Sequence, residues 1–202
     1  TATGGWGFNS PSAGQNGFAI GGTLTPSVAN TSVQFFGTPS ATVSETVGTT
    51  PIDLEITNPS GTANDTVDVV LLSGDPARVN GFTSQMVVFP AGSSANETVT
   101  ITVTDNGVND GNAVIVFQVQ NPRGGQGTSS IGAQSQYTLT ITDDDAPPVV
   151  GFDLASSSVT EGGTALIAVT MNTAPGADVT VDVSDLLTGT AVTAGGDYNT
   201  FS

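Results

Sequence analysis

The chain has 202 residues, enough for one or two domains that each bury a core. It carries 18 acidic residues, two arginines and no lysine, and the net charge of −16 argues against nucleic acid or an anionic membrane as partner. Because cysteine and histidine are absent, disulfides, Ser-His-Asp triads and ordinary zinc or copper sites are excluded. The composition favours a non-enzyme, and its acidity suits either divalent cations or a salty medium.

Residues 1–32 are rich in Gly, Ser and Asn, and their aromatic residues follow no clear period. Two interpretations stay open: an irregular lead-in or the tail of an upstream domain, or a segment whose aromatic side chains dock on a neighbour. No apolar run approaches the roughly 20 residues that cross a bilayer, so we expect no membrane insertion. The Thr-, Ser-, Gly- and Val-rich composition is typical of exported all-β proteins and predicts an extracellular or cell-surface location.

From Val33 onward, large apolar residues alternate with small polar ones, which is the period of half-buried strands. Turn signals such as Asn58-Pro-Ser-Gly61 and Asp105-Asn-Gly107 separate the runs, and no stretch has a helical period. This spacing predicts an all-β fold, an antiparallel Greek-key or immunoglobulin-like β-sandwich. The predicted strands are 33–36, 41–46, 51–57, 65–72, 84–89, 97–104, 113–120 and 136–142.

Three adjacent aspartates, Asp143 to Asp145, follow the last of these strands directly. Like charges raise the free energy of ionising their neighbours, so water or a cation must neutralise the run. Calcium takes six to eight oxygen ligands, and acids at other strand ends, Glu45, Asp105 and Asp110, could join the aspartates if the fold brings these ends together. The alternative is that Asp143–Asp145 is a solvated linker and Asp105–Asp110 an ordinary turn.

An internal repeat divides the chain into tandem copies about 117 residues apart (150 − 33). The predicted boundaries are 33–145 for a complete sandwich, 146–149 for a proline linker, and 150–202 for the N-terminal half of a second, incomplete copy. The matching segments are Val33-Gln-Phe35 with Val150-Gly-Phe152, Val43-Ser-Glu45 with Val159-Thr-Glu161, Thr66-Val-Asp-Val69 with Thr180-Val-Asp-Val183, and Leu71-Leu-Ser-Gly74 with Leu186-Leu-Thr-Gly189.

Half a sandwich leaves apolar faces and strand edges without partners. Either the biological chain continues beyond Ser202, or another chain supplies the missing strands. In the second case, strand addition between subunits, through 150–202 and the segment 1–32, would build a filament.

The order of these motifs resembles the Calx-beta domain family. The resemblance rests on Val-x-Phe at 33–35, Val-x-Glu at 43–45, the stretch from Pro90 to Ser94, the strand 98–105 and the closing Asp143–Asp145. It implies a seven-stranded antiparallel sandwich that binds calcium at one tip through loop carboxylates.

Position by position, the resemblance implies a set of metal ligands: Glu45, Asp105, Asn106, Asp110, Asp143, Asp144 and Asp145 in the first copy, with Glu161 and Asp197 in the second. The first copy departs from the family at Val79-Asn-Gly-Phe82, where the second copy has Gly195-Gly-Asp-Tyr198. Asn106 and Ala113 also stand where carboxylates are expected. These departures favour one weaker calcium site over several.

The remaining charged residues have simpler interpretations. Arg78 and Arg123 are expected to pair with surface acids. Acids that alternate with apolar residues are assigned to the solvent face of strands; they are Asp53, Asp65, Asp68, Asp178 and Asp182.

The sequence predicts a calcium-binding extracellular structural or adhesive module, in which Ca2+ rigidifies the sandwich tip and the junction between copies. It could serve as a subunit of a self-assembling surface filament through strand complementation, with other surface proteins or glycans as partners. The alternative is an accessory, non-catalytic region of a larger secreted enzyme. Catalysis by a carboxylate pair is disfavoured because no cluster of aromatic residues surrounds two acids.

Overall fold

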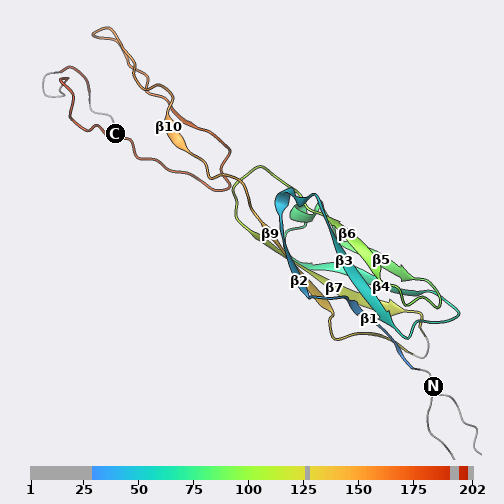
Figure 1. Ribbon diagram of the computed structural model, residues 1–202. Helices are drawn as coiled ribbons and strands as arrows, with labels where there is room; N and C mark the ends of the chain where they lie inside the picture. The colour runs from blue at the N-terminus through green and yellow to red at the C-terminus, as the bar shows by residue number, and fades with distance from the viewer. Residues whose placement is uncertain (1–28, 126–127, 192–195, 200–202) are drawn as a thin grey trace, which may run out of the picture.

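The computed structural model describes residues 29–125, 128–191 and 196–199. Between Thr31 and Thr142 the chain forms two β-sheets packed face to face, with strand orders β6-β3-β1-β8 and β2-β9-β7-β4-β5 (Figure 1). The strands are β1 Thr31–Phe35, β2 Ser40–Ser44, β3 Thr49–Thr57, β4 Asp65–Ser73, β5 Ser84–Phe89, β6 Glu97–Thr102, β7 Ala113–Arg123, β8 Ser129–Ile131 and β9 Gln136–Thr142.

The β-sandwich predicted from the alternating pattern is confirmed, and strands lie at each predicted position. Most neighbouring strands are antiparallel, but two pairs at the sheet edges are parallel, β1 with β8 and β2 with β9. These parallel pairs, and the three-residue strand β8, were not predicted. The first segment, 1–32, for which two interpretations stay open, lies almost entirely outside the described residues.

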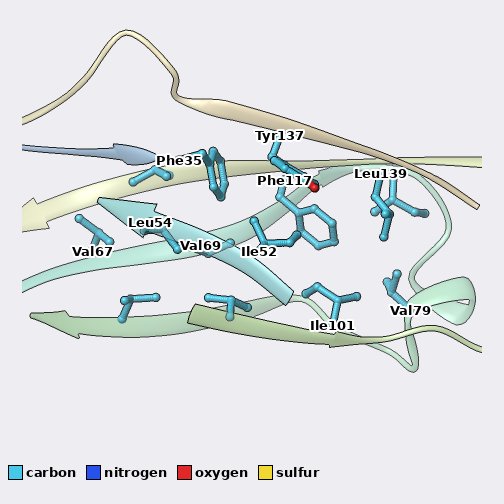
Figure 2. Close-up of a cluster of buried hydrophobic side chains, with 14 of the residues drawn as sticks. Phe35, Ile52, Leu54, Val67, Val69, Val79, Ile101, Phe117, Tyr137 and Leu139 are labelled. Atoms are coloured by element: carbon cyan, nitrogen blue, oxygen red, sulfur yellow. The ribbon is translucent and has the colours of Figure 1, made fainter. Parts of the chain in front are cut away.

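The core lies between the two sheets and is built from the inward-facing residue of each alternating pair (Figure 2). In β3, for example, Ile52, Leu54 and Ile56 are buried, whereas the residues between them reach the surface. The largest fully buried apolar side chains are Phe35, Phe89, Phe117, Ile52, Leu54, Ile101, Ile115, Leu139 and Ile141. At roughly 1.5–3 kcal/mol for each fully buried aliphatic or aromatic side chain, this burial is the main force that holds the sheets together.

Four connections meet at one end of the sandwich, and we call this end the tip. They are the 3-10 helix η1 (Glu45–Val47), the turn that carries the 3-10 helix η2 (Pro76–Val79), the loop 103–112 between β6 and β7, and the residues 143–145 that follow β9. Backbone bonds tie them together, from Val103 N to Gly48 O (2.9 Å) and from Thr104 N to Arg78 O (3.0 Å). The tip is therefore a bonded unit, not a set of independent loops.

After Thr142 the chain leaves the sandwich at the tip and continues into the segment 146–199 (Figure 1). The described part of this segment contains one two-stranded sheet, β10 (Val150–Phe152) paired with β11 (Val169–Met171). Many of its large apolar residues are exposed, including Phe152, Leu166 and Leu186. The proposed second copy of the sandwich stays a prediction. None of the helices in the described residues has the length and apolarity to cross a membrane.

Candidate metal centre

The register of the sheet explains why acids distant in sequence meet at the tip. Strands β2 and β9 run parallel, and Ser44 is paired with Thr142, so the next residues, Glu45 and Asp143, leave the sheet side by side. Ala113 of β7 is paired with Ile141 of β9, which brings the preceding residues, including Asp110, to the same end. The backbone N–H of Asp110 donates to Asp143 Oδ2 at 2.7 Å.

Three of the carboxylates at the tip converge closely. One oxygen each from Glu45, Asp143 and Asp145 lies within 4.8 Å of the other two. Glu45 is fully buried, with 0% of its surface exposed. Neither Glu45 Oε1 nor Asp145 Oδ2 has a hydrogen-bond partner among the described residues, although both atoms are buried. A buried carboxylate oxygen without a partner is costly in free energy, so these two atoms mark a place that a cation would stabilise.

Asp143 is held by backbone donors. Its Oδ2 accepts hydrogen bonds from the N–H groups of Asp110 and Gly111, and its Oδ1 accepts one from the N–H of Asp145 at 2.9 Å. These bonds, led by the one from Gly111, lower the pKa of the Asp143 carboxyl below its ordinary value. Asp143 is thus ionised and fixed in orientation, as a ligand to a hard cation must be.

Glu45 shows the opposite behaviour. Burial raises the pKa of its carboxyl, and the nearby charge of Asp145 raises it further, while the Arg78 guanidinium opposes the shift only in part. The charged form of Glu45 is therefore disfavoured by its surroundings. A divalent ion beside Glu45 would instead favour the charged form of its carboxyl group.

The predicted pairing of Arg78 with a surface acid is confirmed by its contact with the exposed Asp110, but the burial of Arg78 and its contact with the buried Glu45 were not predicted. Arg78 lies in η2 with only 7% of its surface exposed, inside the acidic tip. Its Nη1 contacts Glu45 Oε2 at 3.3 Å, and its Nη2 contacts Asp110 Oδ1 at 2.8 Å and the Gly111 carbonyl at 3.0 Å. The other arginine, Arg123, does pair with a partly exposed acid, Asp68, at 2.7 Å.

The remaining candidate ligands of the first copy lie in the connections of the tip, outside the three-carboxylate cluster, and have other partners. Asp144 Oδ2 accepts from the hydroxyls of Ser44 (2.8 Å) and Thr46 (3.1 Å). The Asn106 amide donates to Asp110 Oδ2 at 3.0 Å, so its nitrogen faces that carboxylate. Asp105 is exposed and accepts from the Gly107 N–H at 3.3 Å, which closes a local turn.

The candidates in the predicted second copy, Glu161 and Asp197, are both exposed in the segment after β10. Neither belongs to the cluster of Glu45, Asp143 and Asp145. One acid assigned to the solvent face is also misplaced. Asp65 is buried at the start of β4, and its Oδ2 accepts from the Ser60 N–H at 2.7 Å.

The residues present fit a calcium ion. Two oxygens that bind one calcium at 2.3–2.6 Å can be at most about 5 Å apart, and the oxygens of the cluster, which lie within 4.8 Å of one another, satisfy this limit. All donors are oxygens, and no histidine or cysteine occurs in the chain, so a hard cation is favoured over zinc or copper. Glu45, Asp143 and Asp145 would hold the ion, and water would complete the coordination.

Solved structures with a similar fold are known. The apo form of the Calx CBD1 domain matches with a TM-score of 0.50 and 18% identity, over 58% of this chain and 100% of that domain. The calcium binding domain CBD12 of CALX1.1 matches with a TM-score of 0.48 and 19% identity, over 64% of this chain and 52% of that one. No protein-family model and no curated protein matches the sequence. The chain therefore has the immunoglobulin-like β-sandwich fold that the Calx CBD1 domain also has.

Proposed function

We propose that residues 29–145 form a calcium-binding β-sandwich module. The observation that carries this proposal is the fully buried Glu45, whose Oε1 has no hydrogen-bond partner in the described part of the chain and whose carboxylate has an oxygen within 4.8 Å of oxygens of Asp143 and Asp145. Without a cation, three carboxylates would share one partly buried space against a single guanidinium. The calcium binding named for CBD12 of CALX1.1 agrees with this proposal.

Calorimetric titration with calcium tests the site. Glu45→Gln and Asp145→Asn should each lower calcium affinity at least tenfold, since loss of even an outer partner of a metal ligand costs about 10–100-fold. Glu55→Gln is the matched control, because Glu55 lies in the middle of β3 and bonds Gln34 at 2.6 Å. Equal affinity in all three variants would refute the site.

We further propose that the module is extracellular, structural or adhesive, and that calcium stiffens the junction after the tip. The contacts of Gly176 support the part of this proposal that concerns the junction. A Cβ atom built on Gly176 would lie 2.7 Å from both Asn109 O and Asp110 Cβ, so its backbone packs against the loop that holds Asp143. Asn109 also donates to the Asp145 carbonyl at 2.8 Å.

Small-angle scattering tests the junction. Gly176→Ala should loosen the arrangement of the two parts and weaken its dependence on EDTA. Gly151→Ala is the control, because a Cβ at Gly151 would meet nothing within 4 Å. A wild-type profile that is the same with and without calcium would leave the ion without a role at the junction.

A second candidate function is self-association into filaments through the segment 150–199. The observation that favours it is the exposed alternating run Val179, Val181 and Val183, because contiguous apolar residues at a surface favour association. Replacing these three valines with threonine should abolish concentration-dependent association in sedimentation, and filaments in electron microscopy. A wild-type chain that sediments as a monomer at all concentrations would refute this candidate.

A further inference from the structure

Arg78 is surrounded by the kinds of ligand that a metal ion takes. Its guanidinium contacts four oxygens from three groups, which are Glu45 Oε2, both carboxylate oxygens of Asp110 and the Gly111 carbonyl, at 2.8–3.3 Å. Two carboxylates and a backbone carbonyl are typical donors to calcium. Arg78 thus neutralises an oxygen cluster that directly adjoins the one formed by Glu45, Asp143 and Asp145.

Glu45 connects the two clusters. Its Oε2 contacts Arg78, whereas its Oε1 has no hydrogen-bond partner among the residues that the structure describes, and its carboxylate is one of the three that converge. Asp110 connects them a second time, because its side chain binds Arg78 and its backbone N–H binds Asp143. A carboxylate shared in this way has the geometry of one that bridges two neighbouring cations.

The charge of the chain makes this use of an arginine notable. Only two basic residues stand against 18 acids, and one of them is buried at the tip. An arginine with a surface role would lie like Arg123, whose side chain is half exposed. The guanidinium carries its charge permanently and, unlike a bound ion, is covalently attached to the chain. It therefore neutralises the tip at every calcium concentration.

Resting on the calcium site proposed above, we propose that Arg78 is a fixed cation that holds the place of a second metal ion. The tip then binds one divalent ion where its acids alone would bind two. It also keeps its arrangement when calcium is removed, because part of the neutralising charge, the guanidinium of Arg78, belongs to the chain.

Equilibrium dialysis of the full chain with calcium, together with thermal unfolding in EDTA, tests this proposal. The wild type should bind one ion. Arg78→Gln should bind two, and should melt at a lower temperature in EDTA but recover when calcium is added. Arg123→Gln is the matched control, which removes the other arginine and should bind one ion with wild-type affinity.

The outcomes separate the two proposals. A wild type that binds no calcium refutes the calcium site itself. A wild type that binds two or more ions refutes only the role of Arg78, as does an Arg78→Gln variant that binds one. A single site that becomes tighter in Arg78→Gln would show that the guanidinium competes with the ion, and would also overturn the proposal.

A second variant decides the matter if Arg78→Gln does not fold. Both carboxylate oxygens of Asp110 bind Arg78, so Asp110 is not expected to be a ligand of the calcium ion. Asp110→Asn should therefore lower the calcium affinity less than threefold, whereas Asp145→Asn should lower it at least tenfold. Equal losses in the two variants would make Asp110 a ligand of the same ion, and the separate place for Arg78 would not exist.

Discussion

The same four residues, Thr-Val-Asp-Val, occur in the sandwich at 66–69 and in the following segment at 180–183, with different structural outcomes. In β4, Val67 and Val69 are fully buried between two sheets. In the second segment, Val181 and Val183 are 54% and 39% exposed and belong to no strand. An alternating pattern therefore specifies which face of a strand is apolar, but a neighbouring strand and an opposite sheet must be present for that strand to form.

The largest effect that would test this comparison comes from the two phenylalanines related by the repeat, Phe35 and Phe152. Phe35 is fully buried and its ring packs 5.7 Å from that of Tyr137, whereas Phe152 is 60% exposed. Phe35→Ala should lower the free energy of unfolding by about 3–5 kcal/mol. Phe152→Ala should change it by less than about 0.5 kcal/mol.

Urea denaturation followed by circular dichroism measures both values. Similar losses for Phe35→Ala and Phe152→Ala would mean that the second segment buries a core of its own in solution, and the contrast between the two regions would disappear.

Calcium should increase the difference in stability between the sandwich and the second segment. An ion that binds only the folded state adds about 2.7 kcal/mol to the free energy of unfolding at a concentration of one hundred times its Kd. We expect this gain to appear in the sandwich, with slower amide hydrogen exchange at Asp110, Gly111 and Asp145, whose N–H groups bind Asp143.

Amides at 180–183 supply the internal control, and Glu45→Gln supplies the matched variant. Protection that rises equally in both regions, or that survives in Glu45→Gln, would contradict a site at the tip.

A smaller effect is expected from the repeat-related valines. Val69→Ala removes two methyl groups from a fully buried side chain and should cost about 2 kcal/mol of stability. Val183→Ala should cost less than about 0.5 kcal/mol. Chemical denaturation of the two variants gives the loss in the free energy of unfolding for each. Equal losses would show that Val183 is also buried.

The strands of the sandwich could be predicted because each carries its own local alternation, as Ile52, Leu54 and Ile56 do in β3. The edge strand β8 could not, because Ser129–Ile131 is short and has no apolar period. The parallel pairing of β2 with β9 was equally inaccessible, since register between distant strands depends on the tertiary fold.

At the site, acids that directly follow strands were visible as candidates, and Glu45 and Asp143 were among them. That Glu45 is fully buried, and that Asp144 instead bonds Ser44, depends on packing that no local pattern encodes. Arg78 was missed because a basic residue after Asp75-Pro-Ala77 resembles a surface turn. The scarcity of basic residues in so acidic a chain was the one available signal.

The smallest predicted effect concerns the aspartates of the repeated Thr-Val-Asp-Val stretch, Asp68 and Asp182. Hydrogen bonds from Arg123 (2.7 Å) and Asn121 (3.0 Å) lower the pKa of the Asp68 carboxyl below its ordinary value of 3.8. Between the lowered value and 3.8 the unfolded chain binds more protons than the folded chain, so the contribution of Asp68 to stability is present above 3.8 and is lost as the pH falls through the folded pKa.

Because Arg123 is half exposed, this contribution should be at most about 1 kcal/mol. Asp68→Asn should remove it, which would flatten the acid limb of stability measured by urea denaturation from pH 5 downward. Asp182 makes none of these contacts, so Asp182→Asn should leave the acid limb of the stability curve as in the wild type. If both variants flatten it equally, Asp182 has a charged partner in solution, and the second segment is packed more like the first than its exposure indicates.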